Sequence, residues 1–112
     1  MILKTITDKL GLEVKNANVD LTAEVTGAYV SDLLSDVIAN SEEGELWITL
    51  QAHPNIVAVA TLKDLAGIIL VNSRQPEQET LEKAREERIP LMITELPTFQ
   101  LAGKLYKLIG EC

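Results

Sequence analysis

The sequence has one cysteine and one histidine, and this scarcity excludes several kinds of site. Its 112 residues hold Cys112 at the end of the chain and His53 near the middle. One cysteine cannot close a disulfide within the chain, and together with one histidine it cannot supply a cysteine cluster or a multi-histidine metal site. We therefore expect no metal site, and the lack of a disulfide fits a reducing cytoplasm.

Positive charge is also scarce. Lys and Arg total 10 against 17 Asp and Glu, which gives a net charge of −7. Such a chain repels nucleic acid and anionic lipid. No apolar run approaches the roughly 20 residues that span a bilayer, and the opening residues 1–5 lack the apolar core of a signal peptide. The expectation is a cytoplasmic globular protein that binds neither nucleic acid nor membrane.

The motifs of the common catalytic machineries are missing as well. No phosphate-binding Gly-x-x-x-x-Gly-Lys-Ser/Thr loop is present, and residues 102–104 (Ala-Gly-Lys) lack its first glycine and its hydroxyl residue. There is no Gly-x-Ser-x-Gly elbow, and no feature of the sequence pairs a serine with His53. The sequence predicts no enzyme activity and no cofactor.

What is present is a regular succession of short apolar runs. Strands are expected near Leu12 and at residues 25–30, 46–50, 68–71 and 91–94, several of them without polar alternation, as in strands covered on both faces. Helical spacing ends at Gly11, and Pro54, Pro76 and Pro97 each open a helical stretch. The prediction is one α/β domain over residues 1–112, with a mostly parallel or mixed sheet of about five strands and helices on both faces.

Residues 56–62 fit either a strand or a helix. Their β-branched residues suit a strand, but the alanines and the preceding Pro54 favour a buried helix that is apolar almost all round. A domain of this size encloses few such helices completely. We therefore expect this helix to meet a second copy of the chain in a homodimer, with Trp47 or Tyr29 beside it. For Trp47 alone, packing in the core is the other interpretation.

Polar residues follow the predicted strands at the edge of the sheet where α/β proteins bind ligands. The candidate ligand-binding residues are His53, Asn55, Asn72, Ser73, Arg74 and Thr98. Arg74 supplies the only positive charge of these loops, so the expected ligand is an anion held near helix N-termini. The alternative is structural: His53 as a loop or capping residue, residues 72–76 as a polar turn, and Thr98 as the cap of the last helix.

The order of strands and turns resembles the DRTGG domain family. The resemblance lies in residues 25–34 and 44–49, then in residues 66–73, Pro76-Glu77 and a charged helix, and finally in residues 89–94 and 97–99. Two of the family's motifs are replaced. Val71-Asn72-Ser73 stands where the family has Thr-Gly-Gly, and residues 51–55 stand where Asp-Arg is usual. The chain is most similar to the standalone branch of the family.

The resemblance implies a fold and a class of function. DRTGG domains are similar to the N-terminal domain of HPr kinase/phosphorylase and occur beside CBS domains in regulated pyrophosphatases, where they support dimerisation and regulation. Standalone members are encoded near iron-only hydrogenase subunits and kinase-like regulators, which implies a regulator or a redox enzyme as protein partner. The leading hypothesis is a non-catalytic homodimeric regulatory domain that acts through such a partner. The alternative is a sensor for a nucleotide or another phosphorylated metabolite.

Overall fold

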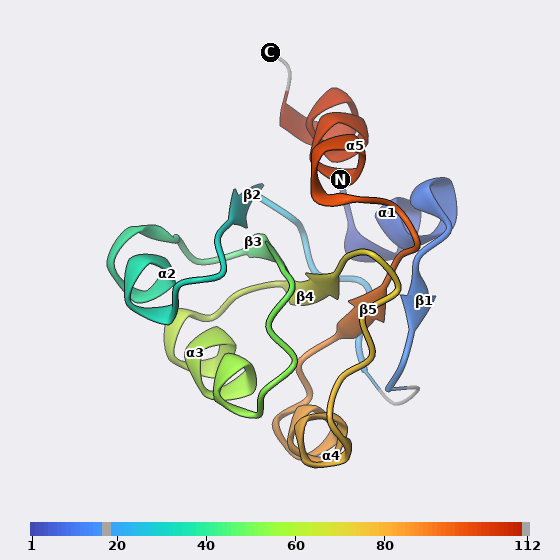
Figure 1. Ribbon diagram of the computed structural model, residues 1–112. Helices are drawn as coiled ribbons and strands as arrows, with labels where there is room; N and C mark the ends of the chain where they lie inside the picture. The colour runs from blue at the N-terminus through green and yellow to red at the C-terminus, as the bar shows by residue number, and fades with distance from the viewer. Residues whose placement is uncertain (17–18, 111–112) are drawn as a thin grey trace.

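A mixed five-stranded sheet forms the centre of the molecule. The computed structural model describes residues 1–16 and 19–110, so Cys112 lies outside the described residues. The strands are β1 (Glu13–Val14), β2 (Gly27–Val30), β3 (Glu45–Thr49), β4 (Gly67–Leu70) and β5 (Leu91–Ile93). Their order across the sheet is β1-β5-β4-β3-β2, with β2 to β5 parallel and β1 antiparallel to β5 (Figure 1). The predicted α/β fold with a mostly parallel sheet is confirmed.

Helices cover both faces of this sheet. They are α1 (Leu3–Leu10), α2 (Leu34–Asn40), α3 (Asn55–Lys63), α4 (Gln78–Glu87) and α5 (Thr98–Leu105), which continues into the π-helical turn η1 (Tyr106–Gly110). Figure 1 shows α2, α3 and α4 along one face, and α1 with α5 along the other. Each layer has its own apolar core, because the inner strands bury side chains toward both faces. Within the described residues, no helix has the length and apolarity to span a membrane.

The ambiguous apolar segment is the helix α3. It buries Ile56, Val57, Val59 and Ala60 against the sheet and the neighbouring helices. Leu62 stays 66% exposed, so only part of the surface of α3 is covered. The choice of helix over strand is confirmed.

One helix start and one helix cap differ from the sequence prediction. The helix expected from Pro76 begins at Gln78, because the backbone of Glu77 is extended (ψ 155°) and so lies outside the helix. Thr98 was expected as a cap of the last helix, but Pro97 takes the position before α5 and no side-chain hydrogen bond caps that helix. The hydroxyl of Thr98 is therefore not a capping group.

Trp47 belongs to the core and not to an interface. Its side chain is 0% exposed, and its indole Nε1–H donates to the Ser31 carbonyl at 2.8 Å. The predicted role of Trp47 beside a second copy is wrong, because β3 is an inner strand of the sheet and its side chains are enclosed on both faces. Tyr29, on the outermost strand β2, is half-buried and donates its hydroxyl to Asp36.

Candidate functional site, a hollow between α1, α5 and the ends of β4 and β5

The loops after β4 and β5 meet at the carboxyl edge of the sheet. The Ser73 N–H donates to the Thr94 carbonyl (2.8 Å), and the Asn72 N–H donates to the Leu96 carbonyl (3.0 Å). The loop after β3 is held by other residues: its Ala52 carbonyl accepts from the Thr80 hydroxyl of α4 (2.6 Å) and from the Glu77 N–H just before α4 (3.2 Å). The structure thus joins two of the three predicted loops directly.

His53 and Asn55 lie in a different hollow from the residues after β4. They line a groove of about 560 Å³ between α3 and α4. His53 Nδ1 accepts a hydrogen bond from the Asn55 backbone N–H (3.1 Å), so the imidazole satisfies an otherwise free donor at the start of α3. This contact matches the structural alternative for His53.

The turn at residues 72–74 offers an anion no free backbone donors. The N–H of Arg74 donates to the Val71 carbonyl (3.0 Å), and those of Asn72 and Ser73 are bonded to the loop after β5. Asn72 and Ser73 both have positive φ values (56° and 57°), the left-handed region that glycine enters at lowest cost. An anion at this turn would depend on side chains, of which Asn72 and Arg74 are exposed and do not line the groove between α3 and α4.

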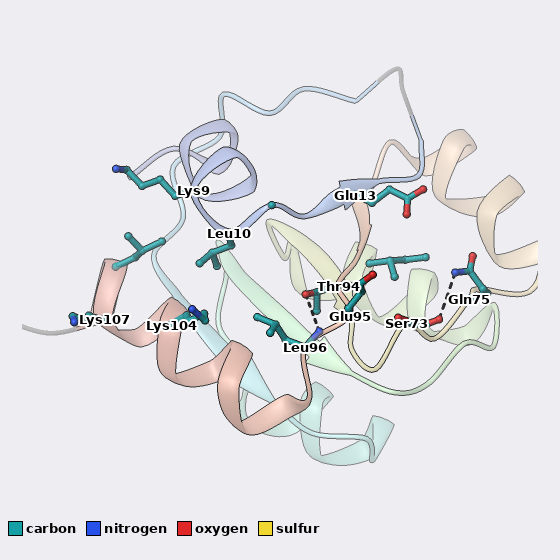
Figure 2. Close-up of a pocket in the computed structure, with 13 residues that line it drawn as sticks. Lys9, Leu10, Glu13, Ser73, Gln75, Thr94, Glu95, Leu96, Lys104 and Lys107 are labelled. Carbon is teal, nitrogen blue, oxygen red and sulfur yellow. Dashed lines mark hydrogen bonds between the residues drawn. The ribbon is translucent and has the colours of Figure 1, made fainter.

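A larger hollow of about 880 Å³ opens beside this turn. Its volume falls within the range of small-molecule pockets. It lies between the end of α1, the start of β1, the loops after β4 and β5, and the α5–η1 segment (Figure 2). Its lining residues are Lys9, Leu10, Gly11, Glu13, Ser73, Gln75, Ile93, Thr94, Glu95, Leu96, Lys104, Lys107 and Leu108. Of the six predicted site residues, only Ser73 is among them.

The charges of this hollow are unevenly distributed. Lys9, on α1, and Lys104 and Lys107, on the α5–η1 segment, lie toward one end, and Ser73, Gln75 and Glu13 lie at the other (Figure 2). Within the described residues, no carboxylate forms an ion pair with any of these lysines. Glu13 forms an ion pair with Lys15 (3.2 Å), and Glu95 is the other carboxylate that lines the hollow. In a chain with a net charge of −7, the lysine end is therefore a local positive region.

Sequence reasoning missed this set of lysines. Lys104 and Lys107 are three residues apart, which places them on the same side of the α5–η1 segment, and this spacing is visible in the sequence. Lys9 comes from the last turn of α1, far away in the chain. Nothing in the sequence indicates that α1 and α5 pack on the same face of the sheet, so this grouping could only come from tertiary structure.

Displaced pKa values occur at another place, the corner between β2 and α2. Hydrogen bonds from Ser31, Asn40 and Tyr29 lower the pKa of Asp36, and the hydrogen bond to Asp36 raises the pKa of Tyr29. The stabilisation from Asp36 is therefore present above its unfolded pKa and is lost as the pH falls through its lower folded value. The stabilisation from Tyr29 is present below pH 10 and is lost as the pH rises through its folded pKa.

We expect Tyr29→Phe to lower the free energy of unfolding at pH 7 and to reduce its alkaline decline. The difference between parent and variant should shrink as the pH rises through the folded pKa of Tyr29. Urea unfolding from pH 7 to 11 measures this difference directly. Tyr106→Phe, at an exposed tyrosine, is the matched control. A constant difference across this range would show that the hydrogen bond to Asp36 does not couple ionisation to folding.

Comparison with known proteins identifies a similar fold among solved structures. No protein-family profile matches the sequence, and no curated protein matches it either. Among solved structures, the chain is similar to the CBS and DRTGG domains of the regulatory region of Clostridium perfringens pyrophosphatase, with a TM-score of 0.69 and 22% sequence identity over 93% of this chain. The fold is DRTGG-like. The structure therefore supports, at the level of fold, the resemblance found in the sequence.

The DRTGG-like fold covers only part of that similar protein. This chain spans 45% of its length, and the similar structure contains an activator, diadenosine tetraphosphate. In the pyrophosphatase, these domains belong to the regulatory region. In the present structure, no three His, Cys, Asp or Glu side chains of the described residues gather closely enough to hold a metal ion.

Proposed function

We propose that this protein is a homodimeric regulatory domain that binds a nucleotide or another phosphorylated metabolite and acts on a partner protein without catalysing a reaction. The observation that carries the proposal is the hollow beside α5, with Lys9, Lys104 and Lys107 at one end. Lysine ammonium groups bind phosphate as point charges with several donors. This favours the sensor hypothesis over a domain that binds partner proteins alone.

The opposite end of the hollow suits the polar remainder of such a ligand. Glu13 and Glu95 offer acceptors, and Ser73 and Thr94 offer hydroxyl groups. A nucleotide combines phosphates with hydrogen-bond donors on its ribose and base. Its phosphates would contact the lysines, and its ribose hydroxyls and base amino group would donate to the carboxylates. The nucleotide activator in the similar pyrophosphatase region is consistent with this ligand class.

The α5–η1 segment connects the proposed ligand site to a second surface. Lys104 and Lys107 line the hollow, while Leu105, Tyr106 and Ile109 of the same segment line an apolar surface beside β2. A ligand bound by the lysines would act on this second surface through the same short helical segment. The π-helical geometry of η1 is a feature that recurs at functional positions in helices. We propose that residues 1–112 act as one regulatory unit in this way.

Calorimetric titration with ATP and with inorganic tripolyphosphate tests the proposal. Both should bind, and a double variant with Lys104→Ala and Lys107→Ala should weaken both by roughly tenfold or more for each lysine, as expected for charge-assisted contacts. Lys63→Ala removes the same charge from α3, outside the hollow, and should change neither affinity. No binding of either compound at millimolar concentration would overturn the proposal.

Two further variants locate the ligand. Glu95→Gln should lower the affinity for ATP relative to tripolyphosphate, because only ATP carries ribose and base donors. Arg74→Ala tests the anion site predicted from the sequence at residues 72–74. If Arg74→Ala weakens binding while the double lysine variant does not, the ligand binds at that turn and the hollow is not the site.

A further inference from the structure

The two edges of the sheet are protected to different degrees. Strand β1 at one edge has two residues, and Glu13 pairs there with Lys15. Strand β2 at the other edge, Gly27–Val30, carries no charge and no proline, and within the described residues it pairs only with β3 (Figure 1). Soluble proteins normally block such an edge with charges, prolines or a covering segment, because its free backbone groups bind other strands. Strand β2 has the properties of an edge that receives another strand.

An apolar surface lies directly beside this open edge. Ala28 and Val30 project on the α5 side of the sheet, since they pair in register with Leu46 and Ile48 of the core on that side. With the α5–η1 segment they surround a hollow of about 220 Å³. Its lining residues are Gly27, Ala28, Val30, Ile48, Ala102, Leu105, Tyr106 and Ile109. No charged side chain is among them, and both Val30 (48%) and Tyr106 (64%) are largely exposed.

The β2 edge is the surface on which two copies of this chain meet with the least charge repulsion. Two copies with a net charge of −7 each repel one another, so they associate best where each surface carries the least charge. Each of the two carboxylates that flank β2 already has a partner within the chain. Glu24 forms an ion pair with the N-terminal amino group, and Asp32 accepts hydrogen bonds from the Thr49 hydroxyl and the Leu50 N–H. The α3–α4 groove, by contrast, is lined by three charged side chains, Glu79, Lys83 and Glu87.

We infer that β2 pairs antiparallel with β2 of a second copy, which extends one sheet across a two-fold axis. An antiparallel edge pair with its axis perpendicular to the sheet keeps equivalent faces on the same side. The two α5–η1 segments therefore meet across the axis and cover the apolar hollows beside β2. This inference rests on the homodimer of the proposed function and names its interface. It moves that interface from α3, where the sequence predicted it, to the β2 edge.

Sedimentation velocity over a series of protein concentrations tests this interface. The parent should sediment as a dimer, and Val30→Lys, which places a charge on the edge strand, should raise the dimer dissociation constant by roughly 100-fold or more. Leu62→Lys, at an exposed apolar residue of α3, is the matched control and should remain dimeric. Circular dichroism verifies that both variants are folded.

The outcomes separate this inference from the proposed ligand site. Val30→Lys should still bind tripolyphosphate, because Val30 does not line the hollow that holds Lys104 and Lys107. A parent that sediments as a monomer at every concentration overturns the inference, whether or not it binds ATP. Dissociation caused by Leu62→Lys but not by Val30→Lys also overturns it, and assigns the interface to α3. Dimerisation without binding of either phosphate compound leaves this inference standing and refutes the sensor.

Discussion

Replacing Trp47 with alanine is expected to lower the free energy of unfolding by about 3–5 kcal/mol, the usual range for a fully buried large aromatic. Trp47 packs among α2, α3 and the sheet with 0% exposure, and its indole bonds to the Ser31 carbonyl at 2.8 Å. The truncation leaves both a cavity and a carbonyl without its donor. A loss of this size removes much of the stability of an ordinary domain, which is about 5–15 kcal/mol.

Urea unfolding followed by circular dichroism measures this effect, because Trp47 is the only tryptophan and its removal abolishes the fluorescence signal. Trp47→Phe should cost less than Trp47→Ala, since it retains most of the buried apolar volume. Leu62→Ala, at an exposed position, should change the stability by less than about 0.5 kcal/mol. If Trp47→Ala costs no more than Leu62→Ala, Trp47 is not part of the core.

The second large effect is expected at Asn16, a fully buried polar residue. Its Nδ2 donates to the carbonyls of Ile89 (2.6 Å) and Ala84 (3.3 Å), and its Oδ1 accepts from the Leu91 N–H (2.9 Å). These bonds connect the segment after β1 to the end of α4 and the start of β5. Asn16→Ala leaves the Leu91 donor and the Ile89 carbonyl buried without this partner, at about 1–3 kcal/mol for each group.

Asn16→Asp gives this prediction a distinctive pH dependence. The carboxylate keeps an acceptor for Leu91 but faces two carbonyl oxygens with no donor, so the folded state should raise the pKa of the new aspartate. Its destabilisation should therefore be greatest at neutral pH and should decrease as the pH falls and the carboxyl gains a proton. Asn55→Asp, at the exposed start of α3, is the control and should not show this recovery. Equal stability of Asn16→Asp at pH 5 and pH 8 would contradict the prediction.

Local patterns were enough to predict the fold class, most of the elements and the helical state of α3. Gly11 ends α1 in the left-handed conformation, and Pro54 and Pro97 each directly precede a helix. These signals are local, because a φ value or a missing N–H acts on its own turn of chain. The apolar runs of β4 and β5 likewise indicated strands covered on both faces, which the structure has.

The sequence also indicated the edge of the sheet at which polar loops gather, but not which side chains share a hollow. It grouped His53 with Ser73 and Arg74 because each follows a strand. The structure separates them. Thr80 of α4 bonds to the loop after β3, whereas the loops after β4 and β5 bond to each other. Such a division depends on contacts between loops, and these leave no periodic trace in the chain.

The amino-acid order by itself determined which residues are apolar, where the turns fall and how little positive charge the chain carries. Tertiary structure decided where that charge is concentrated. Lys9 joins Lys104 and Lys107 because α1 and α5 pack on the same face of the sheet, at opposite ends of the chain. Tertiary structure also placed β2 at the edge of the sheet and enclosed Trp47 on the neighbouring strand β3. Strand order is fixed by packing between distant segments, which no local pattern specifies.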